Sequence, residues 1–411
     1  MLNEPVPTET DLPADDPGTP PVRPLFVVLT SLALLLVFEG LLRLLFPVPE
    51  VMGFQRILYA PGVDPELAPD LGHSADWWWF GPDEDPIPAT VNLYGFRDGP
   101  WPLESDATRV AFFGDSFTDG MGAADDDTLP EAFETLARAD DGDLEAMNFG
   151  SSGFGLRESL ELARDAVPLF RPDHAVLVLY INDFYDPAAV DFDFDPTPTT
   201  FERTSPWQSR LGHVLGRLLT GDRLPRRWRD APGPPRPLPI AERLHGDSAL
   251  RRNIETHVDP ALAAAMVAGQ LNPVITDLLW RSEQTLPRPI EVRRPLAGFR
   301  DFLRQQGTSL SVVYVPSLNQ VTDAYLDAQR RMSRPIASPS LTAPHFQRQA
   351  HDLAWQCAEL GIPFLDTTPA LRRLEASGER LYWPLDSHMT GHGYRRLAEI
   401  FHAWWRETRT P

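Results

Sequence analysis

The chain of 411 residues contains no lysine and only one cysteine. All 37 of its basic residues are therefore arginines, which indicates the coding bias of a GC-rich genome rather than a mechanism. A single cysteine, Cys357, excludes an intrachain disulfide and a cysteine-based zinc site. We interpret Cys357 as a buried, inert thiol, because it lies in a stretch with apolar periodicity.

Positive charge is also scarce. The 37 basic residues are outnumbered by 58 acidic ones, and the formal net charge is -21 at pH 7. Proteins that bind nucleic acid gather positive charge on one surface, so this balance argues against a nucleic-acid partner. Metal-ligating residues do not occur together at recognisable spacings. We therefore expect no metal and no other cofactor.

A long apolar run lies near the N-terminus. Residues 1–24 are rich in Pro, Thr, Asp and Glu and predict a disordered tail. Residues 25–46 are almost entirely apolar, and a helix of this length crosses a hydrocarbon core of about 30 Å. Glu39 and Arg43 are spaced to pair on one face of that helix. We expect a single transmembrane anchor, with a cleaved signal peptide or a buried helix as the alternatives.

The stretch that follows the apolar run, residues 47–108, mixes Pro and Gly with short apolar pieces. This pattern predicts a lead-in of turns and short strands. Residues 77–80 are three tryptophans and a phenylalanine. Such a run is typical of a protein core, with a sugar-stacking surface or an interfacial aromatic belt as the alternatives.

Apolar strands alternate with amphipathic helices from Arg109 onward. The expected strands are residues 110–113, 144–148, 174–181, 310–315 and 363–366. The expected helices are residues 129–139, 156–167, 296–305 and 346–360, and a last one that ends near residue 405. This alternation is typical of βαβ units, so we predict a three-layer α/β/α sandwich with a mainly parallel sheet.

The alternation is interrupted by an insertion at about residues 186–295. This stretch is dense in Pro and Arg, most of all at residues 223–236. Long insertions in compact domains are usually functional lids or disordered segments. We interpret this one as a solvated mobile loop, with an arginine contact to an anionic lipid or polymer as the alternative.

A serine follows the first strand of the sheet pattern. The apolar run ends at Gly114, and a glycine there lets other backbone approach closely. Open parallel sheets place their sites at the carboxyl ends of strands, so Ser116 is a candidate nucleophile. An ordinary turn sequence is the alternative. The pattern Gly-x-Ser-x-Gly is absent around Ser116, which argues against an α/β-hydrolase elbow.

Two histidines precede or begin the last predicted helix. A histidine within two residues of an aspartate can be the general base that activates a serine, while the carboxylate fixes its tautomer. His388 and Asp386 fit these roles, with a surface turn capped by aspartate as the alternative. His392 is a second candidate base, but its place between glycines on a first helical turn favours a structural role.

Four separated blocks resemble the motifs of the SGNH/GDSL hydrolase superfamily. In chain order they are Gly114-Asp115-Ser116, residues 148–153 (Asn-Phe-Gly-Ser-Ser-Gly), Asn182-Asp183 after a strand, and Asp386-Ser387-His388. The resemblance covers about residues 50–185 and 296–405, so the insertion lies outside it.

This resemblance implies an SGNH, flavodoxin-like fold and chemistry on an ester. It implies that Ser116 is the nucleophile, His388 the base and Asp386 the residue that orients the base. It further implies an oxyanion hole made of the Ser116 amide, the Gly153 amide and the Asn182 side chain.

Three features depart from the superfamily's pattern. Phe117 stands where the motif has leucine, and we expect that change not to touch the chemistry. Tyr180 stands where the third block usually has glycine, which predicts a reshaped pocket floor. Asp386 precedes His388 by two residues rather than three, a spacing that resembles the branch with polysaccharide O-acetyltransferase-like members. Hydrolysis and acyl transfer therefore both stay open.

The sequence thus predicts a membrane-anchored serine esterase acting on an O-acyl ester, foremost an O-acetyl ester, of a carbohydrate or lipid. One alternative is an O-acyltransferase acting on a cell-surface glycan. The alternative from another class is a catalytically silent, membrane-tethered glycan-binding or assembly protein. We expect a single-pass protein whose catalytic domain faces away from the cytoplasm, and whose partners are the acyl-ester substrate and the membrane.

Overall fold

The structure is a computed structural model that describes residues 24–45, 48, 50–52, 54, 74–75, 87–186, 190–205, 207–220, 248–268, 271 and 275–409. Residues 1–23 of the expected tail, the aromatic run at 77–80 and the arginine-rich stretch at 223–236 lie outside these residues. The chain divides into two compact units. Within the described residues, the smaller unit consists of 24–45 and 207–220, and the larger contains the rest.

The larger unit is built on a five-stranded parallel sheet in the order β5-β4-β6-β8-β9. Its strands are β4 (Thr108–Gly114), β5 (Leu144–Gly150), β6 (His174–Leu179), β8 (Ser309–Tyr314) and β9 (Phe364–Asp366). The first strand, β4, has β5 on one side and β6 on the other, so the chain changes direction across the sheet at β4. In open parallel sheets, ligand sites lie beyond the carboxyl ends of the strands at such a point.

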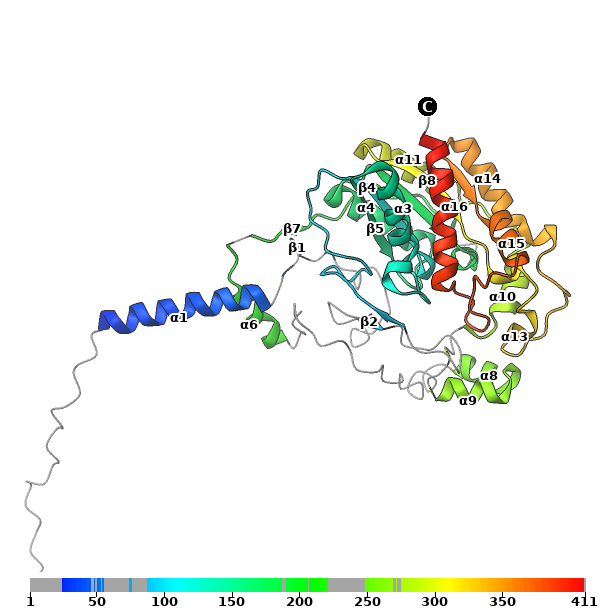
Figure 1. Ribbon diagram of the computed structural model, residues 1–411, viewed down its shortest axis with the longest axis horizontal. Coiled ribbons are helices and arrows are strands. Elements are labelled where there is room, and N and C mark those ends of the chain that lie inside the picture. The colour runs from blue at the N-terminus through cyan, green and yellow to red at the C-terminus, as the bar shows by residue number, and fades with distance from the viewer. Residues whose placement is uncertain are drawn as a thin grey trace, which may run out of the picture. The chain divides into compact units, whose positions relative to one another are not determined.

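Helices cover both faces of this sheet, which confirms the predicted three-layer sandwich (Figure 1). One face carries α4 (Leu156–Phe170), α11 (Arg293–Gln306) and α14 (Arg348–Leu360), and the other carries α3 (Leu129–Asp141) and α16 (Gly391–Arg409). Alternate residues of β4 enter the two cores. Phe113 packs with the α4 layer, whereas Phe112 packs with α3 and α16. Burial on both faces explains why the strands are continuous apolar runs.

Shorter elements complete the larger unit. They are α2 (Ser116–Asp119), η3 (Asp125–Asp127), η4 (Ile181–Phe184), α12 (Leu318–Val321), α13 (Leu326–Arg330), η6 (Pro344–Gln347), α15 (Thr368–Ala376), and the two-stranded pairs β1 (Val51–Met52) with β7 (Glu202–Arg203) and β2 (Ser74–Ala75) with β3 (Pro88–Ala89). The strand expected at 174–181 ends early, at Leu179. The Asp183 carboxylate accepts the Tyr180 N–H at 2.8 Å and turns the chain into η4.

The interpretation of residues 186–295 as a solvated loop is wrong for its described part. This part contains the helices α6 (Arg210–Thr220), α8 (Ser248–His257), α9 (Pro260–Val267) and α10 (Leu278–Thr285). Ile254, Leu262 and Met266 belong to a small separate core that also includes Met332, from outside the insertion. Each of these helices has only 8 to 11 residues, so each shows few core positions and its period is hard to detect.

The smaller unit pairs α1 (Pro24–Leu45) with α6. The 22-residue α1 has the length and composition of a membrane span, features that a signal sequence shares. Most of its large apolar side chains are exposed, and Leu42 is its one buried residue. Glu39 and Arg43 form the expected ion pair, at 2.9 Å.

Candidate active site

Ser116 lies just beyond the carboxyl end of β4, as the first residue of α2. The turn that leads to it needs a glycine. A Cβ atom on Gly114 would lie 2.3 Å from Thr118 Oγ1 and 2.6 Å from the Val178 carbonyl oxygen, closer than real contacts allow. Ser116 is 6% exposed, so little of this residue is accessible to solvent.

His388 reaches Ser116 from the segment before α16. Its Nε2 lies 2.8 Å from Ser116 Oγ, and its Nδ1 contacts Asp386 Oδ1 on the other side of the ring. Ser387, between them, has a φ of 71°, and this left-handed turn lets residues two apart meet. The Asp386 side chain is fully buried and that of His388 is 12% exposed. A carboxylate on Nδ1–H fixes the tautomer whose Nε2 accepts a proton from serine.

Two aromatic residues that the sequence did not single out hold this segment in place. The Trp383 N–H donates to the His388 carbonyl at 2.9 Å, and the Trp383 Nε1–H donates to the Gly122 carbonyl at 2.9 Å. The Tyr394 hydroxyl donates to the Met121 carbonyl at 3.1 Å. Both residues belong to the same C-terminal stretch as His388. Their large aromatic side chains close to the candidate base were the feature of the sequence that could have indicated this supporting role.

Asp115 is a further residue that sequence reasoning missed, although it stands inside the Gly-Asp-Ser block. Its Oδ2 accepts a hydrogen bond from Asn182 Nδ2 at 2.7 Å. Its Oδ1 accepts the Phe117 N–H at 2.9 Å and thereby caps α2. The carboxylate thus joins the end of β6 to the Ser116 turn, and it uses one of the two amide hydrogens of Asn182.

Two buried carboxyl groups of this region, Asp115 and Asp183, interact electrostatically. The pKa of Asp115 is raised, because the effect of burial outweighs the opposing effect of the hydrogen bonds from Phe117 and Asn182. Burial first, and the charge of Asp115 second, raise the pKa of Asp183 well above its usual range. Two carboxylates in one apolar region do not both ionise readily. The hydrogen bond to Asp115 fixes the orientation of the Asn182 side chain.

Gly153, the third expected oxyanion residue, lies in a turn after β5. Its φ of +84° is rare for L side chains, and the Phe154 N–H closes the turn on the Ser151 carbonyl at 3.0 Å. The Ser151 N–H donates to the Gly114 carbonyl at 3.0 Å, which ties this turn to the serine turn. Within the described chain, neither the Ser116 nor the Gly153 amide donates a hydrogen bond to another residue.

Phe117 and Tyr180, the two aromatic residues that depart from the superfamily's motif, pack against each other. The rings of Phe117 and Tyr180 stack with centroids 3.9 Å apart, and both side chains are buried. The Phe117 ring also lies 5.1 Å from the imidazole of His388. The Phe117 ring therefore packs beside the candidate base, and the expectation that Phe117 does not touch the chemistry stays a prediction.

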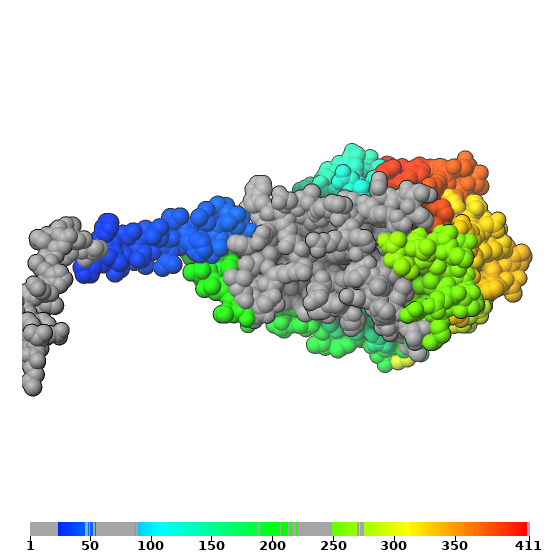
Figure 2. Space-filling view, turned by 90° about the horizontal axis from the view of Figure 1, so that it is seen from below, coloured from blue at the N-terminus to red at the C-terminus, as the bar shows by residue number. Residues whose placement is uncertain are grey.

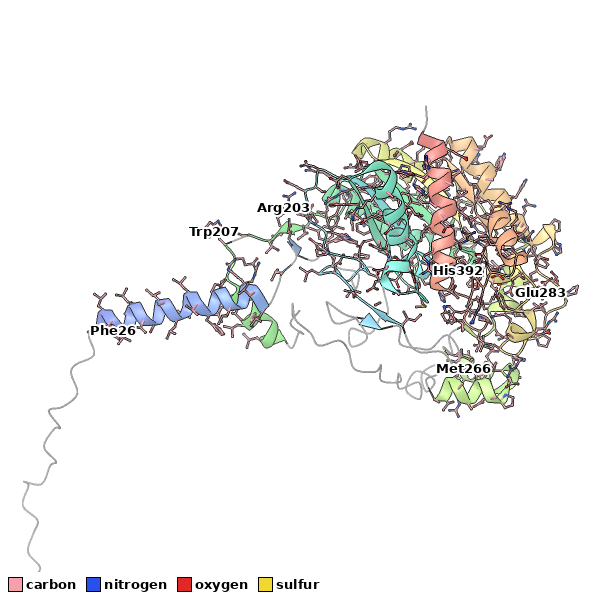
Figure 3. The ribbon with its side chains drawn as sticks, viewed as in Figure 1. Phe26, Arg203, Trp207, Met266, Glu283 and His392 are labelled. Atoms are coloured by element: carbon pink, nitrogen blue, oxygen red, sulfur yellow. The ribbon has the colours of Figure 1, made fainter. Side chains whose placement is uncertain are left out.

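His392 does not reach Ser116. Its Nε2 lies 2.7 Å from Glu379 Oε2, and its side chain is 44% exposed on the first turn of α16 (Figure 3). Geometry therefore selects His388 over His392 as the candidate base.

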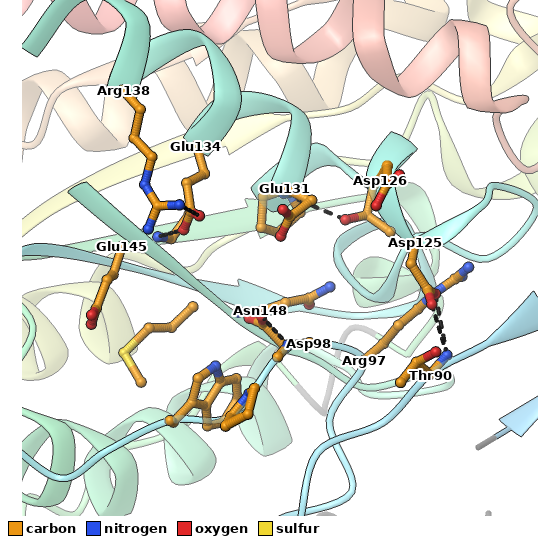
Figure 4. Close-up of a pocket in the computed structure, with 17 residues that line it drawn as sticks. Thr90, Arg97, Asp98, Asp125, Asp126, Glu131, Glu134, Arg138, Glu145 and Asn148 are labelled. Carbon is orange, nitrogen blue, oxygen red and sulfur yellow. Dashed lines mark hydrogen bonds and ion pairs between the residues drawn. The ribbon is translucent and has the colours of Figure 1, made fainter. Parts of the chain in front are cut away.

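A hollow of about 420 Å³ lies between β5 and α3, and none of Ser116, Asp386 and His388 lines it (Figure 4). Its acidic lining residues are Asp98, Asp125, Asp126, Glu131, Glu134 and Glu145. Burial raises the pKa of Asp98 to about 7, and its carboxylate accepts the Asn148 N–H at 2.8 Å. Arg138 pairs with Glu134 at 2.7 Å. The described residues contain no group of three or more ligands that suits a metal ion.

Comparison with known proteins gives one family match. Residues 279–410 match the SGNH hydrolase-like domain described for the acetyltransferase AlgX. No curated protein matches the chain.

Several solved structures are similar to the chain at low identity. The lipase/acylhydrolase from Enterococcus faecalis is 11% identical, with 73% of this chain and 96% of that chain covered and a TM-score of 0.36. The psychrotrophic esterase EstA from Pseudoalteromonas sp. is 7% identical, with 74% and 100% covered and a TM-score of 0.36. The acetyl xylan esterase AlAXEase is 10% identical, with 72% and 98% covered and a TM-score of 0.37.

The family match includes Asp386 and His388, and the parallel sheet brings these residues to the serine of the first block. The order of the four blocks and their convergence at one end of the sheet agree with that match. Residues 279–410 are thus similar to the SGNH hydrolase-like domain, and the parallel sheet with helices on both faces agrees with that similarity.

Proposed function

We propose that the protein is a membrane-anchored serine esterase that acts on an O-acyl ester, foremost an O-acetyl ester, of a carbohydrate or lipid. The observation that carries the proposal is the continuous contact from Ser116 Oγ through the imidazole of His388 to the buried Asp386. A serine hydroxyl is a weak nucleophile by itself, and this arrangement gives it a base and gives the base a fixed orientation.

In the proposed reaction, Ser116 Oγ attacks the acyl carbonyl carbon while His388 Nε2 takes the hydroxyl proton. Asp386 stabilises the imidazolium that forms. The carbonyl oxygen becomes negative and accepts hydrogen bonds from the Ser116 amide, the Gly153 amide and the second amide hydrogen of Asn182. One such donor contributes about 3 kcal/mol in comparable sites. His388 returns the proton to the departing alkoxide, and water then releases the acyl group from Ser116.

Acyl transfer to a glycan hydroxyl is the second candidate for the same site. It is supported by the matching family's description as an acetyltransferase and by the two-residue spacing of Asp386 and His388. The acyl-serine intermediate is the same in both reactions, and only the acceptor that His388 activates differs. An apolar α1 supports attachment to a membrane. The proposal puts the catalytic unit on the side away from the cytoplasm because the proposed substrates include surface glycans and lipids.

A fluorophosphonate probe tests the proposal, because it reacts with activated serines. The full chain should be labelled at Ser116, Ser116→Ala should not be labelled, and the surface variant Ser105→Ala should be labelled like the wild type. A folded wild-type chain that stays unlabelled would favour the silent binding protein. With an acetyl donor and a sugar acceptor present, faster formation of acetylated sugar than of acetate identifies a transferase, and acetate alone identifies an esterase.

A further inference from the structure

Helix α6 lies against the C-terminal part of α1 (Figure 2), and polar contacts join the two. The Glu39 carboxylate accepts the N–H groups of Arg210 at 2.8 Å and Leu211 at 3.0 Å. Arg43 pairs with Glu39 at 2.9 Å and donates to the Gln208 carbonyl at 3.0 Å. The acidic residue that interrupts the apolar run is therefore the cap of a second helix, 171 residues further along the chain.

The segment formed by residues 207–220 exposes large apolar side chains beside α1. Val214 is buried, whereas Leu215 is 49% exposed, Leu219 is 87% exposed and Trp207, just before α6, is 91% exposed. Over the residues that the structure describes, the exposed large apolar side chains of the larger unit number only two, Val267 and Trp355. All the others belong to α1 and to this segment. Exposed apolar groups concentrated in this way mark a surface that is covered in use.

The position along α1 at which α6 is attached indicates what covers the exposed apolar side chains of residues 207–220. Glu39 lies six residues before the end of α1, which is about 9 Å at the helical rise. Helices that lie in a membrane interface sink their apolar face about 5–10 Å into the boundary between headgroups and acyl chains. Tryptophan is enriched at the same depth, because its ring is apolar while its N–H can bond to water or headgroups.

We propose that residues 207–220 form an interfacial segment that lies in the membrane surface beside α1 and contacts lipid through Trp207, Leu215 and Leu219. This inference rests on the proposed membrane anchor. The contacts of Glu39 and Arg43 hold the interfacial segment at the level where α1 leaves the acyl chains. The lipid is recognised as an apolar surface with a polar boundary, and both the segment and α1 expose large apolar side chains.

Site-specific spin labels on the full chain test the inference in vesicles of phosphatidylcholine and phosphatidylglycerol. Cys357 does not need to be replaced, since it is buried and burial raises the pKa of its thiol to about 12. The labelled variants are Leu219→Cys in the interfacial segment, Leu36→Cys in α1, and Val267→Cys in α9 as the matched control. Leu36 is 73% exposed and Val267 is 65% exposed, so each accepts a label without repacking.

Labels in lipid collide more often with dissolved oxygen than with a water-soluble nickel complex. We expect the Leu219 and Leu36 labels to favour oxygen several-fold and the Val267 label to favour nickel. A Leu219 label that behaves like Val267 while Leu36 favours oxygen overturns the interfacial segment and leaves the anchor intact. A Leu36 label that favours nickel refutes the anchor and the segment together. Line broadening at Leu219 that disappears on dilution with unlabelled chain would assign the surface to a second copy and overturn the lipid contact.

Discussion

Two regions of the larger unit bury carboxylates, and they use them in different ways. In the serine site, the carboxylate of Asp386 contacts an imidazole that contacts a hydroxyl. In the acidic hollow, Asp98 accepts a backbone N–H and Glu134 pairs with Arg138. The hollow has more carboxylates and a cavity of about 420 Å³. The groups that its Asp98 and Glu134 contact, a backbone N–H and an arginine, are neither nucleophiles nor bases. The serine site is the candidate active site because its carboxylate contacts a histidine that contacts a serine hydroxyl. Neither the number of carboxylates nor the cavity volume singles it out.

Loss of the serine or the base should have the largest effect on turnover. Ser116→Ala and His388→Ala should each lower the turnover of an activated acetyl ester by about 10⁶, because such residues act as a unit. Asp386→Asn should cost less, about 10⁴, because the other two groups remain. His392→Ala, whose imidazole pairs with Glu379, is the matched control and should keep full turnover. Inactivation by His392→Ala but not by His388→Ala would show that the base is misassigned.

Loss of Asn182 should have the next largest effect on turnover. Asn182→Ala should lower kcat by about 10² to 10³ with little change in KM, because an oxyanion donor acts on the transition state. Glu134→Gln in the acidic hollow should leave kcat unchanged. Steady-state kinetics with an activated ester and a thermal melt of each variant test both expectations. An equal loss of rate in the two variants, with equal melting temperatures, would contradict the separation of the two regions.

The aromatic support of the base predicts a smaller effect. Phe117→Leu restores the residue of the common motif but shortens a side chain that is 1% exposed and stacked on Tyr180. We expect a loss of about 1 kcal/mol in the free energy of unfolding, typical of a modest change of core volume. We expect less than a tenfold loss of kcat, because the imidazole keeps its bonds to Asp386 and Ser116. Urea unfolding and steady-state kinetics measure the two effects, and a loss of kcat without loss of stability would require a direct catalytic role for the ring.

The smallest effect on turnover belongs to Asp98. Asp98→Asn should leave kcat unchanged and alter only how stability depends on pH. The folded protein holds the Asp98 proton up to a pKa of about 7, whereas the unfolded chain releases it near 3.8, so this group's stabilisation is lost as pH rises between those values. The wild-type melting temperature should therefore fall more steeply than that of Asp98→Asn between pH 4 and pH 7. Parallel melting curves for the two proteins would contradict the raised pKa.

Much of the fold and part of the site could be read from local patterns. Buried parallel strands are apolar on both faces, so β4, β6 and β8 stand out from their residues alone. The short helices α8, α9 and α10 did not stand out, because a period needs several turns to show. Ser116, Asp386 and His388 carried signals in their immediate neighbours, since a turn after a strand and an aspartate beside a histidine are local features.

The amino-acid sequence by itself determined the alternation of strands and helices, the apolar α1 and the candidate nucleophile and base, because each depends on residues within a few positions. Tertiary structure alone decided that Asp115 orients Asn182, 67 residues away, and that Glu39 caps α6 from 171 residues away. It also decided that His388, and not His392, contacts Ser116. Hydrogen bonds between distant segments leave no period and no fixed spacing in the chain, so only the packing of the sheet and its helices brings these groups together.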